Sequence, residues 1–298
     1  MKHVVIGSRG SDLALWQAYF VKSELEKLGC SVEINIIKTQ GDKIQHLSFD
    51  KLEGKGFFTK EIEDALLNKD VDLAVHSHKD LETTPPAGLK ISCVSERANP
   101  SDILLINKNA IDADQKWGLK SGAIVGTSSA RRKSQLTRHR KDVEIIDLRG
   151  NVPTRIDKLR QGNYDAILLA KAGVDRLELD LSEFVEVVLD PTEFVPAPAQ
   201  GVLGLQIREG DDDLHEVLQK MNFPAVQQRI NLERKVLNLL DGGCQLPLGV
   251  YCNENNQLHV SFAPSLEGEC ISLDYVVEEF DGMAERVIAD LKAQESVG

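Results

Sequence analysis

Two stretches of this 298-residue chain repeat one pattern, in which a short apolar run is followed by a polar loop and then by a helical segment. Short runs that are apolar throughout are typical of strands buried on both faces, and intervening helices join such strands in parallel. The first stretch has strand-like runs at 3–8, 32–37, 71–76 and 89–94 and helical segments beginning near residues 12 and 60. The second has strand-like runs at 103–106, 123–126, 143–148, 166–170 and 184–189 and helical segments beginning near residues 128 and 152. The pattern predicts two α/β lobes.

Punctuating residues and a change of pattern suggest where the domains begin and end. Asn99-Pro100 is a plausible crossing point between the lobes, and prolines at 191, 196 and 198 precede an apolar run at 204–207 that can return to the first lobe as an added strand. After a strong helix candidate at 224–240, alternating segments at 258–262 and 271–277 and a helix near 283–291 indicate a small antiparallel α+β domain. We expect a first lobe of residues 1–98 and 196–217, a second lobe of 99–195 and a C-terminal domain of 218–298.

Composition excludes several classes of protein. No apolar run approaches the ~20 residues of a membrane helix, and the first residues lack the pattern of a signal peptide, so we expect a cytoplasmic protein without a membrane partner. The formal net charge of -12 disfavours binding to nucleic acid. Five cysteines without a C-x-x-C pair suggest neither a disulfide framework nor a zinc site. Gly54-Lys55-Gly56 lacks the remaining residues of a P-loop, and no dinucleotide fingerprint follows a strand.

Positive charge is concentrated in one segment of this acidic chain. Between Gly126 and Gly162 the chain has ten basic and four acidic side chains, and this segment contains no aromatic residue that could stack on bases. The segment 126–132 ends a strand and opens a helix, where backbone N–H groups, hydroxyls and two guanidinium groups can converge on an anion. Ligands of open α/β sheets bind beyond the carboxyl ends of strands. We therefore expect a carboxylate or phosphate site that includes Arg131, Arg132, Arg149, Arg155 and, in the first lobe, Arg9, whereas Arg138, Arg140 and Arg160 are interpreted as solvated helix charges.

Two further segments could carry chemistry. His76-Ser77-His78-Lys79-Asp80 follows a predicted strand, but no additional ligand motif supports a metal site there. Its Asp80 could stabilise a developing cation and transfer protons, or could merely cap a turn, and spacing alone does not decide. Cys244 lies in a loop after Gly242-Gly243, where it could be an exposed reactive thiol or an incidental loop residue. Cysteines 30, 93, 252 and 270 are more readily interpreted as core residues.

Taken together, these segments resemble the porphobilinogen deaminase family. The resemblance rests on the motifs SRGS at 8–11 with LALWQ at 13–17, GKGFFTKE at 54–61, HSHKD at 76–80, GTSSARR at 126–132, LRGNVPTR at 148–155, YDAILLA at 164–170, PAQG at 198–201 and GGCQ at 242–245. Asp12, Glu53, His78 and Ala130 depart from residues frequent in that family. None of these departures removes a side chain that the family's chemistry requires.

The resemblance implies an enzyme that condenses four porphobilinogen molecules, releases ammonia at each step and hydrolyses off the linear tetrapyrrole. It implies a dipyrromethane cofactor attached covalently to Cys244, no metal, two periplasmic-binding-protein-like α/β lobes, a C-terminal α+β domain that carries the cysteine loop, and a monomeric state. Asp80 would be catalytic and would also contact the cofactor. The cofactor's carboxylates would be held by Lys79, Thr127, Ser129, Arg131 and Arg132. The incoming substrate and growing chain would be held by Arg9, Gln17, Arg149, Arg155 and Arg176.

Two rival classes share some of these features. A noncatalytic binding protein for a small carboxylate or oxyanion would also have two lobes and arginine clusters. A regulatory ligand-binding domain is a further alternative. The Cys244 loop and the expected cytoplasmic location disfavour the binder, and no helix-turn-helix or fused output module accompanies the chain.

Overall fold

The computed structural model describes residues 2–39, 59–241, 246–264 and 270–295. Within them the chain divides into two compact units. One contains the described residues up to 98 together with 201–228, and the other contains 99–200 and the described residues from 229 onward. The predicted division into three domains, 1–98 with 196–217, 99–195 and 218–298, stays a prediction.

The first unit is built on a five-stranded mixed sheet with the order β2-β1-β3-β10-β4. Its strands are β1 (His3–Ser8), β2 (Ser31–Ile36), β3 (Leu73–Ser77), β4 (Leu89–Val94) and β10 (Leu203–Arg208). β1 runs parallel to both β2 and β3, whereas β10 is antiparallel to β3 and β4, as expected for a strand that returns late in the chain. The helices are α1 (Asp12–Lys27), α3 (Lys60–Leu67) and α7 (Asp212–Gln219), with the 3₁₀ turn η2 at His78–Asp80. Buried apolar side chains form one core on each face of this sheet.

The second unit contains a five-stranded sheet of the same design, with the order β7-β6-β8-β5-β9. Its strands are β5 (Asp102–Asn107), β6 (Ile124–Gly126), β7 (Glu144–Ile146), β8 (Ala166–Ala170) and β9 (Phe184–Val188). β6 is parallel to β7 and β8, and β5 is antiparallel to β8 and β9. Its helices are α4 (Ala130–His139), α5 (Val152–Arg160) and α6 (Lys171–Leu177), and short 3₁₀ turns lie at Lys108–Ala110 and Lys116–Gly118.

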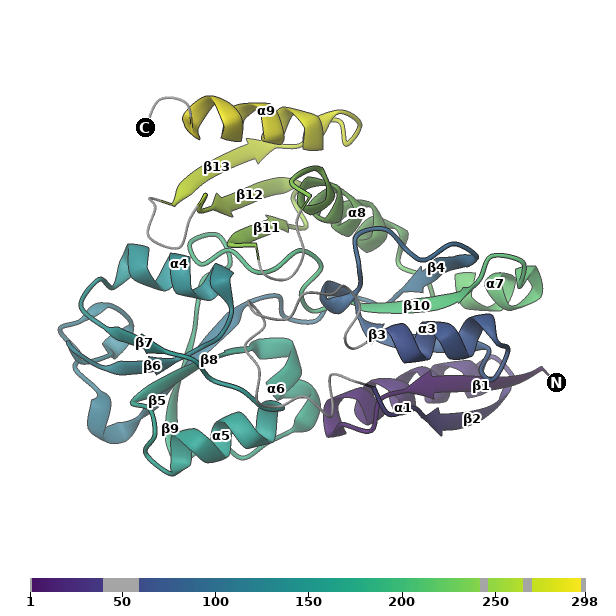
Figure 1. Ribbon diagram of the computed structural model, residues 1–298, viewed down its shortest axis with the longest axis horizontal. Coiled ribbons are helices and arrows are strands. Elements are labelled where there is room, and N and C mark those ends of the chain that lie inside the picture. The colour runs from purple at the N-terminus through teal and green to yellow at the C-terminus, as the bar shows by residue number, and fades with distance from the viewer. Residues whose placement is uncertain (1, 40–58, 242–245, 265–269, 296–298) are drawn as a thin grey trace. The chain divides into compact units, whose positions relative to one another are not determined.

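A three-stranded antiparallel sheet completes the second unit. It consists of β11 (Leu248–Cys252), β12 (Gln257–Phe262) and β13 (Ile271–Val276), and it follows α8 (Pro224–Leu239). α9 (Met283–Glu295) lies across this sheet (Figure 1), and both helices contribute to its separate apolar core. The predicted α/β fold class is confirmed, with two α/β lobes and a small C-terminal α+β domain.

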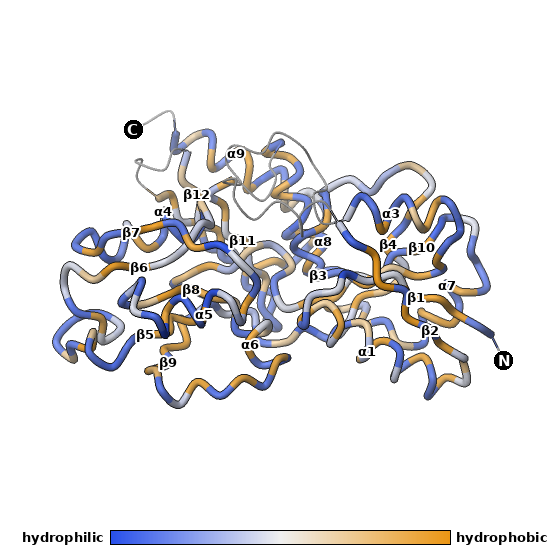
Figure 2. The backbone as a smooth tube through the Cα atoms, turned by 60° about the horizontal axis from the view of Figure 1, so that its bottom comes forward, coloured by the Kyte–Doolittle hydropathy of each residue, from blue (hydrophilic) through white to orange (hydrophobic). Residues whose placement is uncertain are grey.

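Most predicted elements form close to the expected residues, with a few exceptions. Apolar segments follow the strands, while the colour alternates along the helices (Figure 2), which is the pattern that made both recognisable. The run at 143–148 forms only a three-residue strand, and the short elements α6, α7 and β11 have no counterpart in the prediction. Among the described residues, no helix is both long and apolar enough to cross a membrane.

Candidate active site

The loop between β6 and α4 places hydroxyl and backbone N–H groups at a helix N-terminus. Ser129 is the N-cap of α4, and its hydroxyl accepts a hydrogen bond from the Arg132 N–H at 3.5 Å. Thr127 is buried, and its Oγ1 accepts from the Ser129 N–H at 3.3 Å. Gly126 is required because a Cβ there would lie 2.8 Å from the Tyr164 ring. Thr127 and Ser129 thus lie at the start of α4, where the sequence analysis places an anion site, and that site stays a prediction.

Arg131 and Arg132 lie at the start of α4 and converge on one buried carboxylate. Arg131 Nη1 donates to Asp102 Oδ2 at 2.7 Å, and Arg132 donates to Asp102 Oδ1 from Nη2 at 2.8 Å and from Nε at 3.2 Å. Asp102 is 0% exposed, while the arginines are only 4% and 6% exposed. The arginines also donate to the carbonyl oxygens of Val195 and Leu168. The cluster therefore buries two cations against one anion.

The charges of the two arginines offset the unfavourable desolvation of the buried Asp102 carboxylate. Desolvation alone would raise the pKa of Asp102, but the charges and hydrogen bonds of Arg131 and Arg132 outweigh it and hold that pKa well below its usual value. Burial lowers the pKa of Arg131, an effect that the Asp102 charge offsets in part. All three groups are consequently charged at neutral pH, and the cluster carries a net charge of about +1.

The loop after β7 positions the next two predicted residues. Gly150 has a φ of +116°, and a Cβ at this position would lie 2.7 Å from Thr154 Cγ2, so glycine permits both the backbone turn and the close approach of the helix. Asn151 caps α5 by accepting from the Thr154 N–H at 3.0 Å. Arg155 Nε donates to the Gly150 carbonyl at 2.7 Å. Arg149 and Arg155 are both partly exposed.

Arg176 follows the third parallel strand of the same sheet. It lies on α6, directly after β8, and burial lowers its pKa to about 10. Since β6, β7 and β8 are parallel, their carboxyl ends meet at one edge of the sheet. The second unit thus gathers Thr127, Ser129, Arg149 and Arg176 at the sheet edge where ligands of such folds bind.

The first unit presents its own set of predicted residues at the equivalent edge. Arg9 follows β1, while Lys79 and Asp80 lie in η2 at the end of the neighbouring parallel strand β3. Gln17 on α1 is buried and donates from Nε2 to Ser77 Oγ at 2.9 Å, which ties α1 to the end of β3. Asp80 is exposed, and its carboxylate forms no hydrogen bond or ion pair with any residue that the structure describes. Whether the two sets of residues face one cleft stays a prediction.

Cys244 and the loop at 42–56 lie outside the described residues. The residues that follow the cysteine are defined from Leu246 onward, and β11 begins at Leu248. β11 packs directly on the segment that Arg131 contacts. The Val250 N–H donates to the Pro196 carbonyl at 3.0 Å, and a Cβ on Gly249 would lie 2.5 Å from the Val195 carbonyl oxygen. Among the other cysteines, the expected burial is found for Cys30, Cys93 and Cys252, whereas Cys270 is only partly buried.

The prediction for the outer helix charges was wrong at one position. Arg160 is exposed and pairs with Asp157 and Glu183, and Arg138 is also exposed. Arg140, in contrast, is 4% exposed and forms a two-point ion pair with Asp142 at 2.8 and 2.7 Å. It also donates to the carbonyl oxygens of Lys116 and Lys120. Arg140 is the C-cap residue of α4, where a guanidinium can satisfy carbonyls of a folded-back loop, and a helical pattern does not reveal this.

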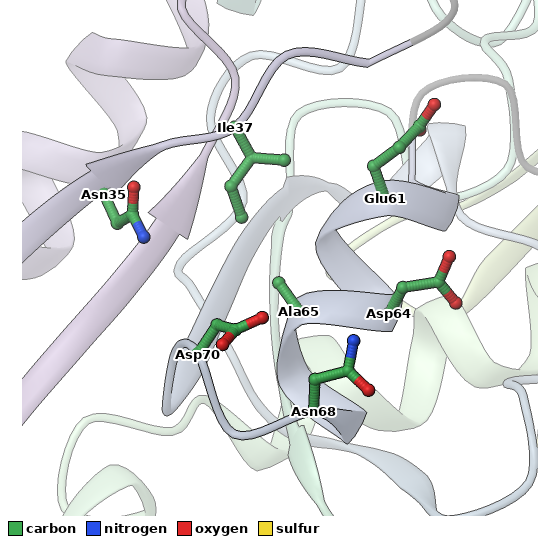
Figure 3. Close-up of a pocket in the computed structure, with 7 residues that line it drawn as sticks. All are labelled: Asn35, Ile37, Glu61, Asp64, Ala65, Asn68 and Asp70. Atoms are coloured by element: carbon green, nitrogen blue, oxygen red, sulfur yellow. The ribbon is translucent and has the colours of Figure 1, made fainter.

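Two other features of the first unit are alternative candidate sites: the buried His76 and an acidic hollow beside α3. His76 is buried and its Nε2 lies 3.0 Å from Gln206 Oε1, and no group of potential metal ligands occurs among the described residues. A hollow of about 520 Å³ beside α3 is lined by the side chains shown in Figure 3, including the carboxylates of Glu61, Asp64 and Asp70. Such a lining repels an acidic ligand, and no predicted site residue contributes to it.

The amino-acid sequence matches two family models in succession. Residues 4–216 match the dipyrromethane cofactor binding domain of porphobilinogen deaminase, and residues 227–297 match its C-terminal domain. This chain belongs to the porphobilinogen deaminase family. The predicted family is thereby confirmed. Among relatives, the porphobilinogen deaminases of Chloroherpeton thalassium and Nitratidesulfovibrio vulgaris strain Hildenborough are 42% and 46% identical, each over 90% of this chain and 85% of the relative. That of Helicobacter hepaticus is 40% identical over 100% of this chain and 90% of the relative.

Two solved structures that resemble this chain share little of its amino-acid sequence. An arginine-specific periplasmic binding protein of Salmonella typhimurium is 11% identical with a TM-score of 0.40, covering 80% of this chain and 94% of that one. The VFT2 domain of Bordetella pertussis BvgS is 13% identical with a TM-score of 0.44, covering 74% and 85%.

Two residues that support the arginine pair were not among the predicted site residues. Asp102 immediately precedes the predicted strand at 103–106, and Gln200 occurs only within the PAQG motif at 198–201. Gln200 Nε2 donates to Asp102 Oδ1 at 3.0 Å and to the Pro100 carbonyl at 2.7 Å. An acidic residue at the start of an otherwise apolar strand was the available signal, because such a residue is rarely buried without a cationic partner.

Proposed function

We propose that this chain is a hydroxymethylbilane synthase, which condenses four porphobilinogen molecules head to tail with release of ammonia and then hydrolyses off the linear tetrapyrrole. The observation that carries the proposal is the buried cationic cluster at the start of α4, inside the region that matches a dipyrromethane cofactor binding domain. We further propose that the enzyme acts as a cytoplasmic monomer, without a metal, nucleic-acid or membrane partner.

The cluster has the properties that a dipyrromethane would require. Each pyrrole ring of that cofactor carries an acetate and a propionate group, so its binding site must supply positive charge and N–H donors. Arg131 uses only Nη1 in its bonds to described residues, which leaves Nε and Nη2 for a ligand. The hydroxyls of Thr127 and Ser129 can donate to carboxylate oxygens while they accept from the helix backbone. Lys79 would supply a further cation from the first unit.

Attachment through Cys244 is part of the proposal. Cys244 follows Gly242 and Gly243 in the sequence, and glycine is the residue type that allows the closest approach of another group to the backbone. β11 is fixed to Val195-Pro196, the segment that Arg131 also contacts, so the chain leaving Cys244 soon reaches the cationic cluster. When bound, the dipyrromethane supplies the nucleophilic pyrrole carbon to which substrate is added.

Asp80 is proposed as the catalytic residue. Its carboxylate is exposed at the end of β3, and it stabilises no turn through a bond to any described residue. A carboxylate in this situation can accept hydrogen bonds from pyrrole N–H groups, stabilise positive charge that develops on the rings and transfer a proton. The geometry favours this role over the capping role that the sequence left open.

Substrate and growing chain are proposed to bind Arg9, Gln17, Arg149, Arg155 and Arg176. Each added ring introduces two carboxylates, so elongation requires further donors beyond those that hold the cofactor. Arg149 lies in the loop after β7, Arg155 lies in the first turn of α5, and Arg176 lies on α6, the helix that follows β8. Gln17 commits one amide hydrogen to Ser77, which leaves its carbonyl oxygen and second hydrogen for ligand contacts.

Intact-mass measurement combined with a product assay tests the function. The purified chain is expected to carry an adduct of dipyrromethane mass and to convert porphobilinogen into hydroxymethylbilane with release of ammonia. Cys244→Ala is expected to fold without the adduct and without activity, and Cys270→Ala serves as the matched control. An unmodified wild-type chain that binds carboxylates without turnover would instead favour the noncatalytic binder.

A further inference from the structure

We propose that Asp102 is a positioning residue, which orients Arg131 and Arg132 so that their remaining N–H groups meet the carboxylates of the primer. The inference rests on the proposed function and assigns a role to a residue that touches neither cofactor nor substrate. Three observations support it: the pattern of donors that Asp102 uses, the way in which Asp102 is itself fixed, and the charge of the cluster.

The donors that Asp102 engages determine where the others point. Arg132 donates from Nε and Nη2 to the same oxygen of Asp102, and its Nη1 donates to the Leu168 carbonyl, so the whole plane of this guanidinium is defined. Among the described residues, Arg131 is bound through Nη1 alone, to Asp102 Oδ2 and to the Val195 carbonyl. The Nε and Nη2 edge of Arg131 is therefore directed away from Asp102. A planar guanidinium fixed along one edge presents its other edge in a defined direction, which suits two-point binding of a carboxylate.

Asp102 can act as a reference point because it is rigid. It begins β5, which lies between β8 and β9 in the sheet, and its carbonyl accepts from the Leu189 N–H at 2.9 Å. Its carboxylate accepts a further bond from Gln200 Nε2, which the Pro100 carbonyl anchors in turn. Side chains that hold functional groups within a narrow range of positions generally need such a supporting layer of hydrogen bonds.

The charge of Asp102 explains why two buried guanidinium groups can lie side by side. Without an anion between them, the two cations would repel each other in an environment of low dielectric constant. A single carboxylate neutralises one of the two charges and leaves a net charge of about +1. The cluster is thus stable enough to fold before the primer arrives, yet it retains attraction for one carboxylate.

Arg140 and Asp142 provide a matched control in the same lobe. Arg140 is as buried as Arg131, and it forms a two-point ion pair with Asp142 and donates to two backbone carbonyls. None of these groups is a predicted site residue. Loss of Asp142 should therefore report what it costs to remove the counterion of a buried arginine when no ligand is involved.

The experiment compares Asp102→Asn, Asp102→Glu and Asp142→Asn with the wild type. Each full-length chain is produced in a host unable to make porphobilinogen, then mixed with porphobilinogen, and adduct formation is followed by intact mass while thermal unfolding is recorded separately. Both Asn variants should unfold at a lower temperature. Only the Asp102 variants should prime more slowly, by about tenfold or more, the size expected when one charge-assisted hydrogen bond is lost. Asp102→Glu keeps the charge but displaces the carboxylate, so slow priming of folded Asp102→Glu assigns the effect to geometry.

The outcomes separate this inference from the proposed function. Wild-type protein that acquires no adduct would overturn both. Wild-type protein that primes, together with Asp102→Asn and Asp102→Glu priming at the rate of Asp142→Asn, would overturn only the positioning role. Failure of both Asp102 variants to fold, with Asp142→Asn folded, would assign Asp102 to folding alone and overturn the inference as well.

Discussion

The two α/β lobes share one strand order, but the equivalent strand carries a different buried polar residue in each lobe. In each sheet one antiparallel strand lies between a parallel strand and an edge strand, namely β10 in the first lobe and β5 in the second. Each carries a buried polar residue that connects several partners. In the first lobe this residue is the neutral Gln206, and in the second it is the charged Asp102.

The connections of Gln206 form a buried chain without a permanent ion pair. Its Oε1 lies 3.0 Å from His76 Nε2, its Nε2 donates to Glu63 Oε1 at 3.0 Å, and Thr59 Oγ1 donates to Glu63 Oε2 at 3.2 Å. Burial raises the pKa of Glu63 and lowers that of His76 to about 4. Both shifts favour the neutral form of the group. Asp102, in contrast, is held in its charged form by two arginines.

The two lobes differ in whether they bury charge. Replacing a buried ion pair by uncharged groups often leaves stability unchanged or increases it, so a buried ion pair is better explained by a role other than stability. In the first lobe, burial shifts the pKa values of Glu63 and His76 toward their neutral forms, while Asp80, the proposed catalytic carboxylate, is exposed at a strand end. The second lobe buries an excess cation at its strand end, as expected of a site that receives an anion.

The strongest test of this comparison is Asp80→Asn. The substitution nearly preserves the shape of the side chain but removes its charge and its capacity to accept a proton. Turnover is expected to fall ~100-fold or more, the cost of removing one preorganised catalytic group. Because Asp80 is exposed and bonds to no described side chain, thermal stability should not change. Single-turnover ammonia release, adduct mass and thermal unfolding would be measured on one preparation.

Asp12→Asn is a suitable control, since it changes an exposed carboxylate in the first turn of α1 in the same lobe. It should retain turnover. Near-wild-type ammonia release from fully primed Asp80→Asn would defeat the catalytic assignment, and a large loss of stability would restore the capping role.

The sequence predicted the features that depend on neighbouring residues, but it did not predict contacts between residues that are distant in the sequence. Strand runs, helix starts such as the Ser11 cap of α1 and the returning strand at 204–207 are encoded locally, and they form as predicted. Asp102 is separated from Arg131 by 29 positions, and Gln206 from His76 by 130, so no periodicity links them. Arg140 was misjudged for the same reason, because a backbone segment distant in sequence buries it.

A second test uses pH. The His76 group and the Asp102 cluster should lose their contributions to stability in different pH ranges. His76 has its folded pKa lowered from 6.5 to about 4, so its contribution to stability is present above pH 6.5 and is lost as pH falls toward 4. By pH 5 the loss is about 2 kcal/mol. The pKa of Asp102 is lowered from 3.8, so its contribution persists until pH falls below that value. Chemical denaturation at pH 7 and pH 5 would measure the difference.

His76→Gln isolates this contribution, since glutamine keeps an amide donor for Gln206 but does not titrate. Glu63 acts in the opposite sense, because its raised pKa means that its contribution is full at low pH and is lost as pH rises. That contribution is common to both proteins and cancels in their difference. An equal loss of stability in wild type and His76→Gln between pH 7 and pH 5 would show that His76 is not buried in its neutral form.

The smallest expected effect separates the two kinds of arginine within the second lobe. Arg149→Leu removes a partly exposed guanidinium that we assign to the growing chain, whereas Arg131 belongs to the buried primer cluster. Arg149→Leu should therefore be fully primed and should elongate about tenfold more slowly, as one lost charge-assisted hydrogen bond predicts. Mass spectrometry after brief exposure to porphobilinogen should reveal accumulated enzyme-bound intermediates. Arg160→Leu, an exposed arginine on α5 paired with Asp157 and Glu183, should elongate normally. If Arg149→Leu instead lacked the primer, the division between cofactor arginines and substrate arginines would have to be redrawn, because one strand end would then serve both.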